Sequence, residues 1–402
     1  MPILNREQMQ KTISDISHSV EAYCLVTALC AFMLIQPGIV LETGYPVQDQ
    51  AGSTINPRLG NRLMEECVRL RKSYDYVEAP TVDTIVTSFF LFGCCFGLNK
   101  HNTAWLHLRE ATALAQILGM QDEDTYLFDS VVETSRKRRL FWLLFVTERA
   151  YALQKHRPLT LHATIALPTV DQDSSNSIAG FIHLVNLYRP FDDTFIGLWN
   201  KSRDDCSSLA LARLQQQLTE ALPAALHTTE GQAADLRTSQ QWLRTMVWQL
   251  SISNSFLSST SSDTSMTFTF PIEIARDLVT VTGQFSKRSL EVHGVGLIEK
   301  IFDVACVLVD VMSCVPIEPW ESEPGPQEYL NQLLTLICTL RGGESRFLPL
   351  VMAKIRDTMP ALLNALPQEL LMKTAIKQES SSSSASSSPY STPPFMHYYP
   401  MA

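Results

Sequence analysis

The side chains of this sequence that are most suited to metal or redox chemistry are two histidines and two adjacent thiols. His101 and His107 lie on either side of Trp105, and imidazoles at short spacing can bind a metal ion. Six residues apart on or beside a helix they point in different directions, so we interpret them as capping or surface residues. Cys94 and Cys95 could bind a soft metal or become oxidised, but the surrounding run SFFLFGCCFGL predicts a core position for both.

Three consecutive carboxylates, Asp122 to Asp124, are the clearest candidates for acid–base chemistry. They follow Gly119 in a segment with the composition of a turn, where a solvated loop explains them, and acid–base work would require burial. The sequence contains no GxSxG, GxGxxG, GxxxxGK[ST] or HExxH pattern. We therefore assign no catalytic, cofactor-binding or metal-binding residue and predict a protein that is not an enzyme.

The basic run Arg136 to Arg139 is the charge feature that most invites a functional reading, as a nuclear import signal or a phosphate-binding patch. Four consecutive residues on a helix point all round it and cannot form one face. Because Leu140, Phe141 and Trp142 follow, we expect packed stems with charged heads paired to acids.

The composition excludes several classes of protein. The chain has 402 residues, of which 45% are hydrophobic and 18% charged, so it can bury a large core. A net charge of -9 opposes phosphate, which argues against direct DNA binding and against an anionic membrane surface. The longest apolar runs, 22–35 and 85–98, are shorter than the roughly 20 residues that a spanning helix needs. The opening residues lack the features of a signal peptide, and nine cysteines without a CxxC pair suit reduced thiols, so we expect an intracellular protein.

The elements that must position these residues are predicted to be helices throughout. Thr103 is the expected N-cap of a helix that stops at Gly119, and Ser130 with Glu133 forms a capping box for a helix that must end before Pro158. For the second helix we expect a single buried face: Leu140, Leu143, Leu144, Thr147, Ala150 and Tyr151. The fold class is all-α, a multi-helix domain with helical-hairpin packing, divided into 1–200, 201–375 and a disordered tail, 376–402.

The expected tail has a composition that cannot cover the entropy cost of ordering. It is a serine run followed by proline and aromatic residues, and Phe395, Tyr398 and Tyr399 could contact a partner. Lys377 lies in the pattern Ile-Lys-Gln-Glu, which fits an acceptor for a small ubiquitin-like modifier. The alternative is an ordinary charged edge where the last helix frays.

The segment SRKRRLFWLLFVTERAYALQKHRPLTLHATIALP resembles the central signature of the fungal transcription factor regulatory domain, the middle homology region. In that family a basic–aromatic stretch, an acid–arginine pair, an Arg-Pro and a Leu-Pro follow one another. The matching residues here are Arg138, Arg139, Phe141, Trp142, Glu148, Arg149, Arg157, Pro158, Leu167 and Pro168. The resemblance implies a structural role for them. His156 departs from the pattern, because many members have Gly there.

Further segments, among them WLHLREATALAQILGM and RFLPLVMAKI, are similar to the activators of amylolytic genes in filamentous fungi. Those regulators begin with a zinc cluster of six cysteines, which this chain does not contain. No DNA-binding residue can therefore be carried over, which suggests either a lost DNA-binding module or a truncated reading frame.

The resemblance implies a nuclear transcription regulator, shuttling with the cytoplasm, that controls starch or maltose degradation genes. Its expected partners are other regulators or co-regulators and a small sugar inducer, without specific DNA binding of its own and without a membrane. The alternative is a pathway-specific regulator of a fungal secondary-metabolite gene cluster, since the same domain is reused there.

Overall fold

The computed structural model describes residues 3–36, 56–169, 175–315, 324–368 and 370–371. Within these ranges the regular elements are sixteen α-helices and three 3-10 helices, without a strand, so the all-α prediction is confirmed. The chain divides into two compact units, Met1–Leu236 and Arg237–Ala402. The expected tail, 376–402, and Lys377 lie outside the described residues.

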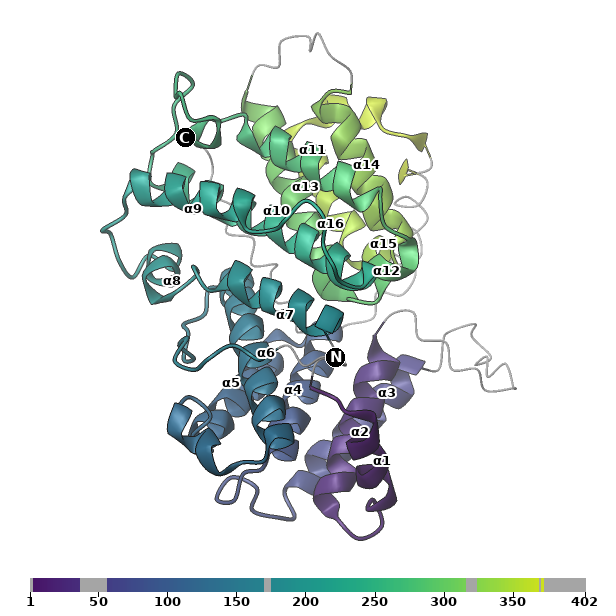
Figure 1. Ribbon diagram of the computed structural model, residues 1–402. Coiled ribbons are helices and arrows are strands. Elements are labelled where there is room, and N and C mark those ends of the chain that lie inside the picture. Colours follow the sequence, from purple (N-terminus) through teal and green to yellow (C-terminus); the bar gives the residue numbers. More distant parts are fainter. Residues whose placement is uncertain (1–2, 37–55, 170–174, 316–323, 369, 372–402) are drawn as a thin grey trace. The chain divides into compact units, whose positions relative to one another are not determined.

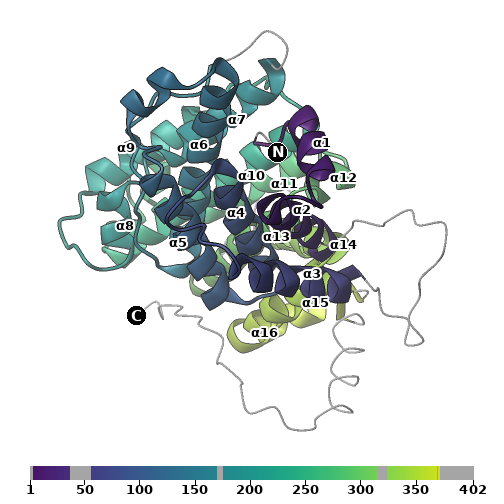
Figure 2. The same cartoon turned by 90° about the horizontal axis from the view of Figure 1, so that it is seen from below.

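The first unit begins with hairpins of helices. These are α1 (Arg6–Ser14), α2 (Val20–Ile35), α3 (Asn56–Arg71), α4 (Val82–Gly97) and α5 (His101–Ile117). Helices α2, α3 and α4 lie side by side, and α4 pairs with α5 across a short turn (Figures 1 and 2). Gly93 makes one close approach between helices: a Cβ there would lie 2.5 Å from the Phe32 ring on α2.

The ends of α5 test two sequence predictions. Gly119 adopts the left-handed φ of +71°, which confirms the predicted stop. The expected cap at Thr103 is wrong, because the helix already begins at His101, and Lys100 at the N-cap gives no side-chain bond. The preceding turn closes tightly, since the Lys100 N–H donates to the Cys95 carbonyl at 2.8 Å, and the chain turns helical before it reaches Thr103.

The 3-10 helix η1 (Glu123–Phe128) leads into α6 (Val131–Lys155), the helix that carries the signature. Helix α6 contacts α4, α5, α7 (Ser175–Tyr188) and α8 (Asp193–Trp199). It is therefore buried around most of its circumference in its second half, and the predicted single face was too narrow. Leu143, Thr147 and Ala150 from that face are only half-buried, whereas Phe145 and Val146 beside them are buried.

The remaining helices of the first unit are α9 (Ser208–Glu220) and the start of α10 (Glu230–Ser253), which continues into the second unit. The second unit is built around α13 (Val295–Cys314), which contacts α11 (Phe270–Thr282), α14 (Pro326–Thr339) and α16 (Leu348–Thr358). Helix α13 is buried on nearly all sides, as expected for a helix that is apolar all round. The shorter elements are η2 (Thr264–Met266), α12 (Lys287–Glu291), α15 (Gly343–Arg346) and η3 (Pro360–Ala365).

Candidate functional site

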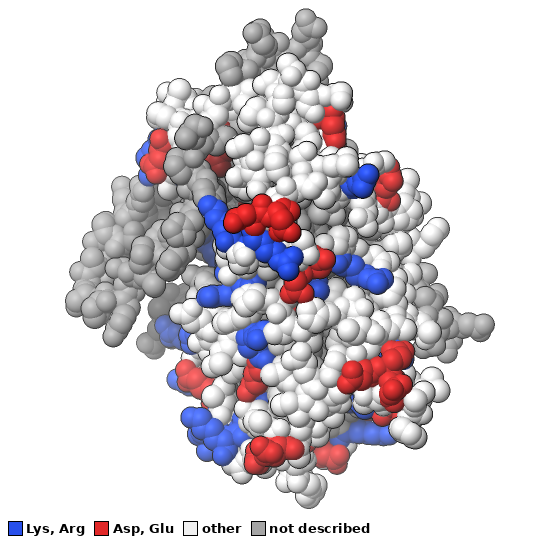
Figure 3. Space-filling view, turned by 90° about the vertical axis from the view of Figure 1, so that its left-hand side faces the viewer, with Lys and Arg blue, Asp and Glu red and all other residues white. Residues whose placement is uncertain are grey.

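The N-terminal half of α6 holds the basic run, and the structure gives each of its four cations a partner. Arg136 pairs with Asp83 of α4, and Lys137 pairs with Asp129 at 2.8 Å. Ser130 caps the helix by accepting the Glu133 N–H at 3.2 Å. On the face of the protein drawn in Figure 3, Lys and Arg side chains lie next to Asp and Glu side chains instead of forming a broad basic surface.

Arg138 and Arg139 complete the run. Arg138 donates to Glu123 of η1 at 2.9 Å, and its guanidinium lies 4.3 Å from the centre of the Tyr126 ring. Arg139 donates to the carbonyl and hydroxyl oxygens of Ser135 at 3.1 and 2.9 Å. The run thus joins α6 to neighbouring segments and is not a free phosphate-binding patch.

Phe141 and Trp142, the aromatic pair of the signature, are both buried. The Trp142 indole N–H donates to the Ala166 carbonyl at 3.0 Å, and its ring meets Phe145 edge-on at a centroid distance of 4.9 Å. The residue that precedes the Leu-Pro end of the signature is therefore hydrogen-bonded to α6, the helix that carries the first part of the signature.

Glu148 and Arg149 hold the segment that follows α6 by its main chain. The Leu161 N–H donates to Glu148 Oε2 at 2.9 Å, the Thr160 hydroxyl donates to Glu148 Oε1, and Arg149 donates to the Leu161 carbonyl at 3.1 Å. The two side chains are 0% and 2% exposed. Arg109 of α5 lies 3.5 Å from Glu148 and supplies a second cation. Burial lowers the pKa of Arg149 to about 10, although the Glu148 charge opposes the shift.

Arg157 and Pro158 follow the end of α6, as the sequence predicted for the proline. His156 adopts a left-handed φ of +51°, and its ring stacks on Trp199 at 5.5 Å. Stacking thus holds an imidazole where a left-handed residue favours Gly, which gives the departure from the family pattern a physical basis. Arg157 lies 5.6 Å from the Trp105 ring centre and forms no ion pair with a described residue, and it is Glu148 and Arg149 that hold the segment after α6.

Sequence reasoning missed a partly buried polar cluster centred on Glu110 of α5. Its carboxylate accepts hydrogen bonds from Arg71 at 2.9 Å, Tyr76 at 2.6 Å and Ser88 at 2.9 Å, and lies 3.3 Å from His107 Nδ1. Burial by itself would raise the pKa of Glu110, but the hydrogen bonds and the Arg71 charge outweigh it and lower the pKa to about 2. The i, i+3 spacing of His107 and Glu110 was the available signal.

The two histidines and the adjacent thiols do not converge on a shared site. His107 belongs to the Glu110 cluster, whereas the His101 ring packs edge-on against Phe96.

Cys94 Sγ lies 4.0 Å from the Ala28 carbonyl and Cys95 Sγ lies 3.7 Å from Met64 Sδ, and burial raises the pKa of both thiols. All nine cysteines, each a described residue, are free, although Cys30 and Cys314 are exposed and not core. Among the described residues no group of His, Cys, Asp or Glu side chains is placed to hold a metal ion.

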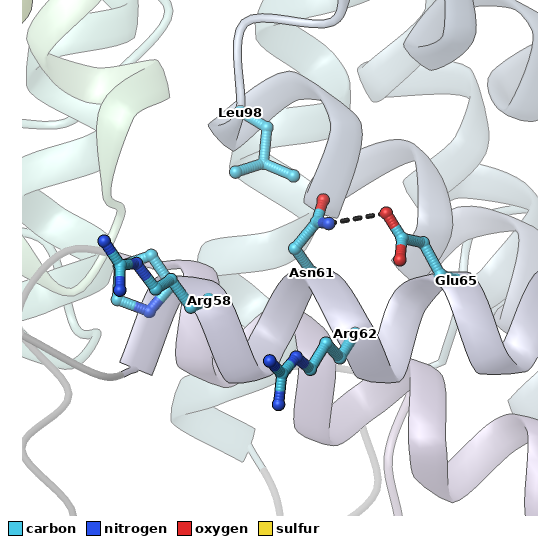
Figure 4. Close-up of a pocket in the computed structure, with 6 residues that line it drawn as sticks. Arg58, Asn61, Arg62, Glu65 and Leu98 are labelled. Carbon is cyan, nitrogen blue, oxygen red and sulfur yellow. Dashed lines mark hydrogen bonds between the residues drawn. The ribbon is translucent and has the colours of Figure 1, made fainter.

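Described residues line a pocket of ligand size in each of the two units. The first, of about 510 Å³, lies along α3 and is lined by Arg58, Asn61, Arg62 and Glu65 (Figure 4). The second, of about 410 Å³, lies in the second unit, and the described residues that line it are uncharged: Trp248, Ser259, Thr267, Phe268, Thr269, Val311, Cys314 and Val315. Both volumes fall within the range of small-molecule pockets, about 300–1,000 Å³. A lining of aromatic rings, aliphatic groups and hydroxyls suits a neutral ligand.

The buried charges of Glu148 and Arg149 fix a main-chain segment by hydrogen bonds. The chain matches the sequence model of the fungal specific transcription factor domain over residues 1–266, and it belongs to that family. Members of the family are transcription regulators. The resemblance of the signature is thereby confirmed.

Curated relatives extend the similarity to most of the chain. The probable sucrose utilization protein SUC1 of Candida albicans is 26% identical over 346 residues, covering 85% of this chain and 66% of that protein. The maltose fermentation regulatory proteins MAL13 and MAL63 of Saccharomyces cerevisiae are 26% and 28% identical, covering 77% and 78% of this chain and 64% and 65% of those proteins. This chain thus spans just under two thirds of their length. No solved structure matches it.

Proposed function

We propose that this chain is the regulatory domain of a transcription regulator of carbohydrate-utilisation genes, with maltose- or starch-degrading genes as its targets. The observation that carries the proposal is that proteins named for sucrose utilisation and maltose fermentation align with more than three quarters of the chain. The family match supports a role in transcription and not in catalysis.

The proposal includes a nuclear location, a small sugar inducer and other regulators as partners. The cavity of the second unit supports a neutral inducer, because the hydroxyls and aromatic rings of its described lining residues suit a sugar better than a charged metabolite. The paired basic run and the net charge of -9 support regulation without specific DNA contacts from this chain. None of the described helices has the length and apolar composition needed to cross a bilayer.

A reporter assay with the whole chain tests this function. The 402 residues are fused to a bacterial DNA-binding domain, and a reporter carrying its operator is measured in yeast grown on maltose, sucrose, glycerol or glucose. We expect output to rise several-fold on maltose or sucrose relative to glycerol, whereas the DNA-binding domain alone does not respond. Equal output on all four carbon sources, at equal protein level, would contradict a sugar-responsive regulator and favour control of a biosynthetic cluster.

A further inference from the structure

Four neighbouring apolar side chains at the start of the signature helix are turned into solvent. Leu127, Phe128, Val131 and Val132 are 73%, 94%, 81% and 68% exposed, and we refer to them as the exposed apolar patch. Single exposed apolar residues are normal, but four within six residues, including an almost fully exposed Phe, mark an interaction surface.

The patch is presented by an anchored segment. Tyr126, directly before it, is buried, and its hydroxyl donates to the Met120 carbonyl at 2.6 Å. The Thr125 hydroxyl donates to the Gly119 carbonyl at 2.9 Å, and Lys137 holds Asp129 in the middle of the segment. The anchored chain therefore holds these apolar side chains toward solvent. Because the segment is already fixed, it loses little conformational entropy when a partner binds.

The surroundings of the patch are acidic. Residues 121–133 contain five acids and no Lys or Arg. The charges of Glu123 and Asp129 are matched by Arg138 and Lys137. Asp122, Asp124 and Glu133 form no ion pair with a described residue and leave the patch with a negative rim.

We propose that the exposed apolar patch is a docking site for a partner protein that offers an apolar groove bordered by Lys and Arg side chains. An aromatic anchor with a charged rim is the usual composition of such a contact, and complementary charge supplies its specificity. Nucleic acid and anionic membranes carry the wrong sign for this rim.

Two occupants from the protein itself fit less well. A symmetric contact with a second copy would place like-charged rims, including Asp124 and Glu133, against one another. The aromatic end of the chain, 390–402, contains no Lys or Arg to meet the rim. The negative rim therefore selects a separate, basic partner.

Photocrosslinking of the full chain in living cells tests the proposal without relying on a sugar response. Val131 is replaced by the photoreactive amino acid p-benzoylphenylalanine, and the crosslinked peptides are identified by mass spectrometry. The matched control carries the same group in place of Val292, a single apolar residue that is 71% exposed. We expect position 131 to yield a crosslink to a separate protein, on a peptide rich in apolar residues and Lys or Arg, that position 292 does not give.

Two variants in the Val131-labelled chain then test the two parts of the contact. Phe128→Ser should lower the crosslink yield about tenfold, the effect of removing an aromatic anchor. Asp124→Lys combined with Glu133→Lys should lower it several-fold, and Leu209→Ser, at a 59% exposed site, should leave it unchanged. Asp124, Phe128 and Leu209 are exposed and Glu133 is half-buried, so circular dichroism melting should show an intact fold.

The proposal is overturned by crosslinks found only within the chain or to a second copy, or by equal yields at positions 131 and 292. Yields that do not change in Phe128→Ser or in the charge-reversed variant would also contradict it. A crosslink that follows this pattern in cells where the reporter ignores sugars would sustain the docking site while the proposed function fails.

Discussion

The two halves of α6 use similar charged residues in opposite ways. In the N-terminal half, Arg138 pairs with Glu123, a carboxylate whose side chain is 48% exposed. In the C-terminal half, Glu148 and Arg149 are almost fully buried and bind the main chain of Leu161. Exposed ion pairs contribute about 0–1 kcal/mol, whereas leaving a buried charge without its partner costs about 3–5 kcal/mol. The signature therefore combines a replaceable surface contact with a pair that specifies the path of the chain.

The largest expected effect is the loss of the buried carboxylate. Glu148→Ala should lower the free energy of unfolding by about 3–5 kcal/mol, because it leaves Arg149 charged and buried and the Leu161 N–H without an acceptor. Urea denaturation followed by circular dichroism measures the change. The matched control, Glu123→Ala, removes a half-exposed carboxylate of η1 that pairs with Arg138 of α6, and it should cost about 1 kcal/mol or less. Similar losses in the two variants would remove the distinction between the two halves.

Glu110 is a second carboxylate in a largely buried cluster. The dependence of the free energy of unfolding on pH therefore tests how strongly such a carboxylate stabilises the fold. Its pKa is lowered from an ordinary 4.5 to about 2, so its stabilisation is present above pH 4.5 and is lost as the pH falls toward 2. The shift corresponds to about 3 kcal/mol. Glu110→Gln should therefore show a shallower loss of unfolding free energy between pH 6 and pH 3 than the unchanged chain. Parallel curves would show that the cluster does not stabilise the carboxylate.

Arg138→Ala tests the N-terminal half of α6 directly. It removes the ion pair with Glu123, the contact with the Tyr126 ring and a 3.3 Å hydrogen bond to the Ala166 carbonyl. We expect a loss of about 1 kcal/mol that shrinks in 0.5 M NaCl, because salt screens exposed charges. Melting curves at low and high salt provide the measurement, and a loss as large as that of Glu148→Ala would be inconsistent with a surface role.

The smallest effect is expected for Arg157→Ala. The guanidinium lies 5.6 Å from the Trp105 ring and has no ion pair among the described residues, so the melting temperature should fall by only about 2 °C. The response to maltose in the reporter assay should not change. Unchanged stability together with a lost sugar response would instead identify Arg157 as a ligand contact.

The helix ends that carry local signals were predictable, and the positions that depend on neighbours were not. Gly119 and Pro158 stop or follow helices for reasons that lie in their own backbones. The expected cap at Thr103 failed because a tight turn one residue before the helix sets its start. The buried face of α6 was misjudged because periodicity assumes one neighbouring surface, and α6 is surrounded by several helices.

The amino-acid sequence by itself determined that this chain is helical, that it belongs to a family of fungal transcription regulators and that its signature helix ends before Pro158. Apolar periodicity, Gly and Pro act within a few residues, so they can be read along the chain. Only the tertiary structure decided that Glu148 and Arg149 hold Leu161, that Glu110 gathers donors from three other segments, and that Phe128 stays in solvent. These outcomes depend on which residues meet across long stretches of sequence, and burial and pairing at a distance leave no local pattern.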